Sequence, residues 1–219
     1  MRLSHSHSAI TLFENCPYRY FHQRVAKTVE DKGGEASLYG ERIHSALELR
    51  LKEDAELPQE AKHYAPLTDS VKRAAEGAQL YVEQELTLND NLTPTGWWDS
   101  DAWLRSKLDV LIISGDSAIV MDWKTGKRKP DFSQLELFAL QVFKHYPEVQ
   151  KVKTSFVWLK TLEIDSETFF RTEAHDMWAK LLARIQRIQD ALEHDNWPAK
   201  PSGLCRYCPA RHLCDYAQL

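Results

Sequence analysis

Two aspartates and a lysine are spaced in this chain so that they can act together. They lie in the stretch KLDVLIISGDSAIVMDWKTG. If this stretch folds as a hairpin that turns at Gly115-Asp116, counting outward from the turn places Asp109 opposite Asp122. Facing residues have Cβ atoms about 4.5–5.5 Å apart, so the two carboxylates repel unless a cation or a proton lies between them. Lys124 projects from the same face as Asp122, and carboxylates beside a lysine suit a divalent metal that assists hydrolysis of a phosphodiester.

The hairpin around these residues is apolar on both faces, which predicts that it is buried in a sheet. An isolated Asp-x-Lys is more often a pair of solvated charges at a strand end. The facing Asp109 and the buried hairpin favour a polar site at the rim of a core. We therefore predict a site for Mg²⁺ or Mn²⁺, with Asp109 and Asp122 among its ligands.

The remaining elements predict a mixed α/β fold around one sheet. Apolar periodicity and cap residues predict helices over residues 8–25, 38–54, 69–86, 133–146 and 176–194. Strands are predicted over 102–113, 117–125, 152–160 and 168–174. Ser8 is the predicted cap of the first helix, and Ser133 with Glu136 forms a predicted capping box. We expect a single domain over 1–219, with a helical part (1–95), a catalytic sheet with helices (96–195) and a cysteine-bearing tail (196–219).

Composition limits the classes of function. The 219 residues are 43% hydrophobic and 27% charged, as in ordinary globular proteins, and no apolar run approaches the length of a membrane span. A formal charge of −4 excludes a chain that coats nucleic acid by its overall charge, but permits a local basic groove. The first residues lack the apolar core of a signal peptide, so we expect a cytoplasmic location and reduced thiols.

The four cysteines are the second group with ligand chemistry. Cys205, Cys208 and Cys214 are clustered near the end of the chain, and Cys16 lies far upstream. Three interpretations compete: an iron–sulfur cluster held by all four thiolates, a structural zinc held by the same four, or zinc held by the three tail cysteines and His212. The last is awkward because His212 and Cys214 are only two residues apart.

These motifs together resemble the PD-(D/E)XK nuclease superfamily, and more narrowly its RecB-type branch that includes the CRISPR-associated iron–sulfur exonucleases. That branch has a GxxxH helix, a GxxD strand, a (D/E)xK strand, a QxxxY helix, and a CP followed far downstream by C-x2-C-x5-C. The matches here are GERIH with Gly40 and His44, SKLD ending in Asp109, DWKTGK with Asp122, Lys124, Thr125 and Gly126, QLELF beginning at Gln134, and the four cysteines. Ser106 replaces the glycine of the GxxD motif, and Phe138 occupies the tyrosine position.

The resemblance implies a restriction-endonuclease-like core, with a central mixed sheet flanked by helices. It also implies specific roles for the matching residues. His44, Asp109, Asp122 and the backbone carbonyl of Trp123 would bind Mg²⁺ or Mn²⁺, Asp109, Asp122, Lys124 and Gln134 would form the catalytic set, and Cys16, Cys205, Cys208 and Cys214 would hold a [4Fe–4S] cluster, with zinc as the alternative.

The function implied is a metal-dependent deoxyribonuclease, most simply an exonuclease on single strands or DNA ends. Its partners would be DNA and the proteins of recombination and repair, phage replication or CRISPR adaptation, with no membrane. A non-catalytic DNA-binding or assembly subunit on the same fold, or an endonuclease, is the alternative.

Possible DNA contacts follow from basic and aromatic residues. Lys127, Arg128 and Lys129 come directly after the catalytic strand, where they could bind phosphates. Tyr20 and Arg24 belong to an aromatic and basic segment of the first helix, although in a helix packing is a stronger explanation than base stacking. Trp97 and Trp98, in a predicted loop, are a third candidate.

Overall fold

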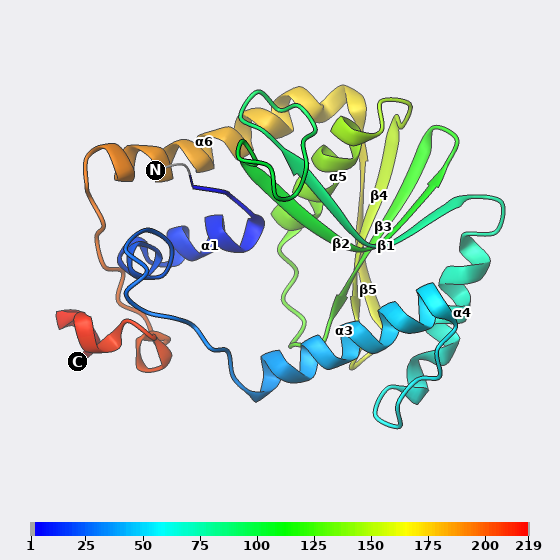
Figure 1. The fold of residues 1–219 in the computed structure, drawn as a ribbon, viewed down its shortest axis with the longest axis horizontal. Coiled ribbons are helices and arrows are strands. Elements are labelled where there is room, and N and C mark those ends of the chain that lie inside the picture. Colours follow the sequence, from blue (N-terminus) through cyan, green and yellow to red (C-terminus); the bar gives the residue numbers. More distant parts are fainter. Residues whose placement is uncertain (1–2, 219) are drawn as a thin grey trace. The chain divides into compact units, whose positions relative to one another are not determined.

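A five-stranded mixed sheet carries the hairpin with the paired aspartates (Figure 1). Neighbouring strands follow chain order, and only β3 and β4 are parallel, joined through helix α5 as a parallel connection requires. The strands are β1 (Gln79–Leu88), β2 (Leu104–Ser114), β3 (Ser117–Lys124), β4 (Lys151–Trp158) and β5 (Glu163–Phe170). The predicted mixed α/β fold with a central mixed sheet is confirmed.

The β2–β3 hairpin has the predicted register. Ser114 pairs with Ser117 and the ladder continues to Val110 opposite Met121, so the next step brings Asp109 opposite Asp122. Gly115 opens the turn with φ 56°, a left-handed conformation that glycine adopts without a Cβ penalty. The turn chemistry and the alternation of the two strands therefore determine where the carboxylates meet.

The structure, a computed structural model, describes residues 3–218. These residues divide into two compact units, one of Gly33–Met177 and the other of the residues up to Lys32 together with those from Trp178 onward. The longer helices are α1 (His7–Asn15), α3 (Glu35–Glu53), α4 (Ala65–Ala74), α5 (Phe132–His145) and α6 (Ala174–Glu193). The sheet lies wholly in the first unit and all four cysteines lie in the second; a single domain over the whole chain stays a prediction.

Helix α3 packs against the sheet through an apolar stripe. Ile43, Leu47 and Leu51 recur at i, i+4 and i+8, and all three are buried in one core cluster with strand residues such as Val110 and Trp123. The apolar periodicity that predicted a helix over residues 38–54 comes from this stripe. It fixes the rotation of α3, and with it the direction in which the polar face of the helix points.

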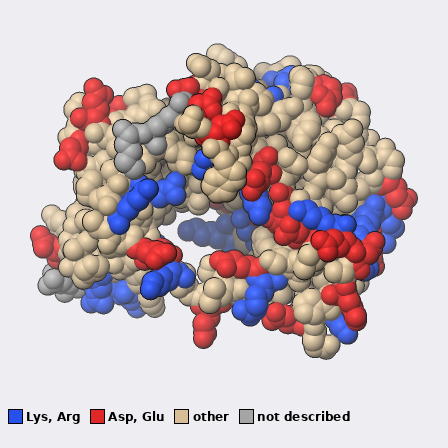
Figure 2. Space-filling view, in the orientation of Figure 1, with Lys and Arg blue, Asp and Glu red and all other residues tan. Residues whose placement is uncertain are grey.

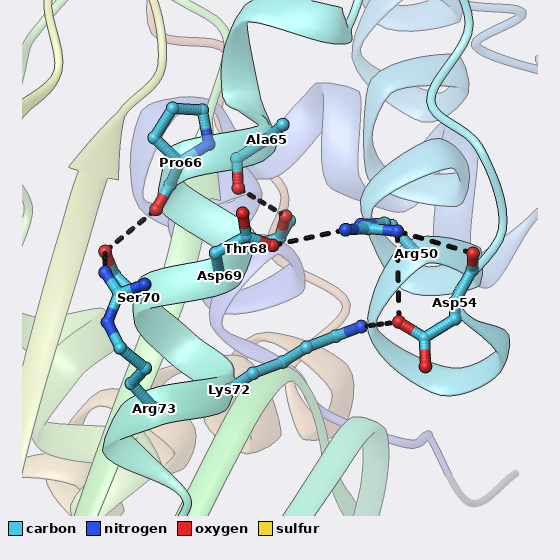
Figure 3. A network of polar contacts seen from close by, with 9 residues as sticks. All are labelled: Arg50, Asp54, Ala65, Pro66, Thr68, Asp69, Ser70, Lys72 and Arg73. Carbon is cyan, nitrogen blue, oxygen red and sulfur yellow. Dashed lines mark hydrogen bonds and ion pairs between the residues drawn. The ribbon is translucent and has the colours of Figure 1, made fainter.

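Polar contacts join the end of α3 to α4 (Figure 3). Arg50 of α3 donates to Asp69 of α4 at 3.2 Å, and Lys72 of α4 pairs with Asp54, which ends α3 in a left-handed conformation. Thr68 and Ser70 bond back to carbonyls of their own helix. Since most of these groups are partly exposed, the contacts orient the two helices more than they stabilise them.

Three sequence predictions are corrected. The helix predicted over 69–86 ends at Ala74, and after a turn with Gly77 at φ 75° the chain forms β1, so residues 1–95 are not wholly helical. The period-2 pattern of β1 had been masked by apolar residues that also fit a helical repeat. Helix α5 is capped by Asp131, whose carboxylate accepts from the Ser133 N–H, in place of the predicted capping box. The first helix is capped by Ser6, which lies two residues before the predicted cap, Ser8.

The second unit is built from both ends of the chain. Helix α1 ends at Asn15, and Pro17 begins the short helix α2 (Pro17–Tyr20), which continues as a π-helical turn over Phe21–Val25. The Tyr20 ring lies edge-to-face with Phe13 and stacks with Trp197 of the C-terminal segment, at centroid distances of 5.5 and 6.2 Å. Residues far apart in the sequence thus share one aromatic core.

Shortening the buried stripe of α3 should destabilise the fold. Leu47→Ala removes a fully buried side chain, and we expect a loss of about 2–5 kcal/mol in the free energy of unfolding, measured by urea denaturation. Leu49→Ala is the matched control, since Leu49 lies on the same helix and is 44% exposed; its effect should stay within about 0.5 kcal/mol. Equal losses in the two variants would contradict this packing.

Candidate metal-dependent active site

A cleft of about 540 Å³ opens where α3 meets the middle of β1 and β2 and the end of β3. The candidate metal ligands His44, Asp109 and Trp123 line it, as does Lys124, whereas Asp122 lies beside it. Its polar lining comes from four elements: His44 and Glu48 of α3, Glu83 of β1, Lys107 and Asp109 of β2, and Lys124 of β3. Residues that are 80 positions apart in the sequence are thereby brought to one surface.

His44 projects from α3 between two oxygen acceptors. Its Nδ1 lies 3.2 Å from Asp109 Oδ1 and its Nε2 lies 3.0 Å from the Trp123 carbonyl oxygen. Burial lowers the pKa of His44, but the hydrogen bond and negative charge of Asp109 outweigh burial, so the pKa is raised overall. A neutral imidazole carries only one N–H, and its other nitrogen is then free to bind a metal.

Asp109 is fixed by the neighbouring strand. Its Oδ2 accepts from the Trp123 backbone N–H at 2.6 Å, while Oδ1 faces His44. The side chain is buried, and a buried carboxylate must have its charge compensated. Trp123 thus contacts both side chains through its backbone. Its carbonyl faces His44 and its N–H donates to Asp109, which brings the two side chains to one short segment of β3.

Asp122, Lys124 and Gln134 form a triangle beside this group. Lys124 Nζ lies 2.6 Å from Asp122 Oδ2 and 3.1 Å from Gln134 Oε1, and Gln134 Nε2 lies 3.3 Å from Asp122 Oδ1. Gln134 reaches the other two from α5, whose start is set by the Asp131 cap. Burial raises the pKa of Asp122 to about 6, against the opposing effect of Lys124 and with the help of the Asp109 charge.

Glu83 of β1 is a site residue that the sequence analysis missed. Ligand atoms of His44, Glu83 and Asp109 all lie within 4.8 Å of one another, which is the spacing needed to share one cation. Burial raises the pKa of Glu83, partly opposed by an ion pair with Lys107 at 2.5 Å. The residue was missed because this segment was predicted as helix; read as a strand, it pairs with β2 so that Glu83 falls opposite Asp109.

The backbone of Glu83 is unusual for a residue in a strand. Its φ is 56°, in the left-handed region, and the regular pairing of β1 with β2 is interrupted there between Val82 and Gln84. Such a conformation costs on the order of 1–3 kcal/mol for a non-glycine residue and is most often found at functional sites. The strain directs the carboxylate toward His44 and Asp109.

Gly40 allows α3 to approach β3 closely. A Cβ placed at Gly40 would lie 3.0 Å from Thr125 Oγ1, tighter than ordinary van der Waals contact. Gly40 lies one helical turn before His44, so the same close approach brings the imidazole to the carbonyl of Trp123. The glycine and histidine of the GERIH motif therefore serve one geometry.

The two departures from the family motifs lie in buried positions. Phe138 packs in the core from α5 with 3% of its surface exposed, and Ser106 is also buried in β2. Neither residue lines the cleft that contains the metal ligands. Their replacement of tyrosine and glycine therefore leaves the described site residues in place.

The predicted DNA contacts differ in their surroundings. Tyr20 is fully buried, so the prediction that it contacts DNA is wrong. Arg24 donates to the Ser4 carbonyl at 3.1 Å, and Arg128 forms two bonds to Asp165 and one to Glu163. Lys127 and Lys129 are exposed and stay predictions. Basic and acidic side chains are interspersed on the face shown in Figure 2, in keeping with the small net charge.

The tail is folded back beside Cys16, and all four cysteines are half-buried free thiols. Cys16 Sγ accepts from the Lys200 N–H at 3.5 Å, and Tyr18 donates from its hydroxyl to the Leu213 carbonyl. Burial raises the pKa of Cys208, with a further contribution from the nearby thiols of Cys16 and Cys205. Within residues 3–218, no three of these sulfur atoms lie within 4.8 Å of one another.

Comparisons with known proteins identify the class. The family model of the PD-(D/E)XK nuclease superfamily matches residues 4–215. The chain therefore belongs to this superfamily, and its sheet and flanking helices form the restriction-endonuclease-like core of that class. Members use divalent metals, and the donor set of imidazole and carboxylate oxygens fits Mg²⁺ or Mn²⁺.

Two solved structures match the chain at low identity. A "Putative exonuclease" from Eubacterium rectale is 15% identical with a TM-score of 0.55, over 98% of this chain and 87% of that chain. The structure of SSO0001 is 14% identical with a TM-score of 0.47, over 99% of this chain and 88% of that one. No curated protein matches the chain. Among the described residues, no helix is both long and apolar enough to cross a bilayer.

Metal affinity should rise with pH. Below about 6 Asp122 holds a proton and loses its negative charge, and the raised pKa of His44 keeps that ring positive, so both groups oppose a cation. Titration calorimetry with Mn²⁺ at pH 5.5 and 7.5 should therefore show tighter binding at the higher pH. The difference should shrink in Asp122→Asn and persist in Asp116→Asn, which alters an exposed turn residue. Equal affinity at both pH values in the wild type would contradict this electrostatic description.

Proposed function

We propose that the protein is a divalent-metal-dependent DNA nuclease, acting as an exonuclease on single strands or DNA ends. The observation that carries the proposal is the meeting of His44, Glu83, Asp109, Asp122 and Lys124 in and beside one cleft of a PD-(D/E)XK core. Grouping several acidic side chains at a partly buried sheet edge costs free energy unless a cation compensates their charge. A metal site for phosphodiester hydrolysis gives each of them a role.

His44, Asp109, Asp122 and the Trp123 carbonyl are the proposed metal ligands, and Glu83 joins them. His44, Glu83 and Asp109 already have atoms close enough to share one ion, while Asp122 is turned toward Lys124. When bound, the ion would lower the pKa of a water molecule and neutralise charge on the scissile phosphate. Asp109 needs no rearrangement for this, because the Trp123 N–H already holds its second oxygen.

Lys124 is the proposed stabiliser of charge on the phosphate. Gln134 and Asp122 hold its ammonium group at the cleft, and the Phe156 ring lies 5.0 Å from Nζ. An incoming phosphate would compete with Asp122 for this cation, which frees the carboxylate to bind the metal. Gln134 contacts both partners and therefore positions Lys124 and Asp122 relative to each other.

The narrower assignment to the RecB-type, iron–sulfur branch rests on the motif order and on the cysteine set. The structural neighbour from Eubacterium rectale named as an exonuclease agrees with action at DNA ends. On this assignment the protein serves recombination and repair, phage replication or CRISPR adaptation in the cytoplasm, together with the proteins of those processes.

Removing a catalytic side chain should abolish cleavage without unfolding the protein. With Mn²⁺ present, the wild type should degrade end-labelled linear DNA and spare covalently closed circles. Asp122→Ala and Lys124→Ala should each lower the rate at least about 100-fold, because the first deletes a proposed metal ligand and the second deletes the proposed cation at the phosphate.

Asp116→Asn in the exposed β2–β3 turn is the matched control and should retain the wild-type rate. Thermal unfolding of each variant verifies that it is folded. Wild-type rates in either catalytic variant would refute the assignment, and cutting of closed circles would make the enzyme an endonuclease.

We further propose that Cys16, Cys205, Cys208 and Cys214 hold a [4Fe–4S] cluster. The tail lies beside Cys16, because the Lys200 N–H donates to Cys16 Sγ. The Cys16 and Cys205 thiols also contribute to the raised pKa of Cys208. Four thiolates on one zinc ion are about 3.8 Å apart, given a Zn–S bond of about 2.3 Å. In a cluster each cysteine binds a different iron atom, so its sulfurs are farther apart.

Loss of Cys16 should free the tail. If all four thiolates bind one cluster, Cys16→Ser and Cys214→Ser should lower iron and sulfide content alike, and limited proteolysis should cut both variants faster in residues 196–218. Protein purified without oxygen provides the reference, with absorption near the blue end of the visible spectrum. A colourless wild type with one bound zinc would exclude the cluster, and a tail equally protected in Cys16→Ser and wild type would exclude the role of Cys16.

A further inference from the structure

Trp98 is a large aromatic side chain left open to solvent in the loop between β1 and β2. Its side chain is 85% exposed, whereas Trp97 beside it is half-buried. The guanidinium carbon of Arg105 lies 5.5 Å from the Trp97 ring centre and 5.9 Å from that of Trp98. The Trp98 ring therefore offers a large aromatic face on which a binding partner could stack.

The loop that carries Trp98 is held by its own hydrogen bonds. Thr95 Oγ1 lies 2.8 Å from an Asp99 oxygen and 2.9 Å from an Asp101 oxygen, so its single proton is available to either carboxylate, and the Gly96 N–H donates to Asp99 at 2.7 Å. The side chain of Asn89 accepts from backbone N–H groups of the same loop. These bonds hold in place the backbone of the loop that presents Trp98.

A row of side chains connects this loop to the metal site. Arg105, Lys107 and Asp109 alternate along β2 and therefore lie on one face of the strand. Lys107 and Asp109 both line the cleft. At about 3.3 Å per residue, Arg105 lies roughly 13 Å along the strand from Asp109. The order from the cleft outward is metal ligand, lysine, arginine and exposed indole.

We propose that Trp98 stacks on a base of single-stranded DNA whose backbone follows Lys107 and Arg105 into the cleft. This inference rests on the proposed nuclease function and adds the path of the substrate strand. Alternation of cations with an aromatic ring is the chemistry that binds a single strand without reading its sequence. An apolar protein partner would require a continuous apolar patch, but the Trp98 ring lies beside the Arg105 guanidinium and precedes Asp99 in the chain.

The test measures binding and cleavage separately. Fluorescence anisotropy in EDTA follows binding of a fluorescein-labelled oligo(dT), which stays intact without metal. Trp98→Ala should weaken this binding about 5- to 100-fold, because one stacked base is lost. Trp98→Phe should retain most of the affinity, since a benzene ring still stacks. Binding to a blunt DNA hairpin, whose bases are paired, should be the same in Trp98→Ala and wild type.

Phe170→Ala is the matched control at the opposite edge of the same sheet. Phe170 is also an exposed ring beside a cation, with Lys151 Nζ 6.0 Å from its centre, but it lies on β5, far from the β1–β2 pair in strand order. The Phe170→Ala variant should bind oligo(dT) as tightly as the wild type. Unchanged binding by Trp98→Ala, or equal weakening for oligo(dT) and the hairpin, overturns the proposal. Wild-type cleavage with Mn²⁺ is scored in parallel, so a wild type that neither binds nor cuts DNA identifies failure of the nuclease function itself.

Discussion

The structure depends on two carboxylates that face each other in a buried antiparallel strand pair. Asp109 and Asp122 are opposed by the register of β2 and β3, and neither can stay charged there without compensation. Each is compensated separately: Asp109 by the Trp123 N–H and His44, Asp122 by Lys124 and Gln134. The placement of α3 and α5 then follows, because these helices deliver the histidine and the glutamine to the rim of the sheet.

The site contains unfavourable free energy of two kinds, one from a strained backbone and one from like charges held close together. Glu83 holds a left-handed conformation inside a strand, and its carboxylate is shared between Lys107 and the metal-ligand group. Burial raises the pKa of Glu83 and of Asp122, and the negative charge of Asp109 adds to both shifts. A divalent ion would relieve this repulsion, so the same arrangement that destabilises the empty fold favours binding.

The sequence predicted the parts of the site that depend on local spacing. A turn and a period of two were enough to place Asp109 opposite Asp122, and apolar periodicity predicted a helix over residues 38–54, where α3 lies. Glu83 was not predicted as a site residue because the apolar spacing of β1 also fits a helix. Only the pairing of this segment with β2 distinguishes strand from helix. Tyr20 was placed among DNA contacts because its burial depends on Trp197, which no local pattern reveals.

The unit formed by residues up to Lys32 and from Trp178 onward has a consequence for synthesis. The ribosome releases the N-terminal helix first, but Tyr20 meets Trp197 only after the whole sheet unit has been made. Until then the apolar side chains of the N-terminal helices lack Trp197 as a packing partner, a condition that favours association with other chains or with chaperones. The sheet unit faces no such delay, because all its strands have emerged by Phe170. The order of assembly is therefore sheet first and terminal unit last.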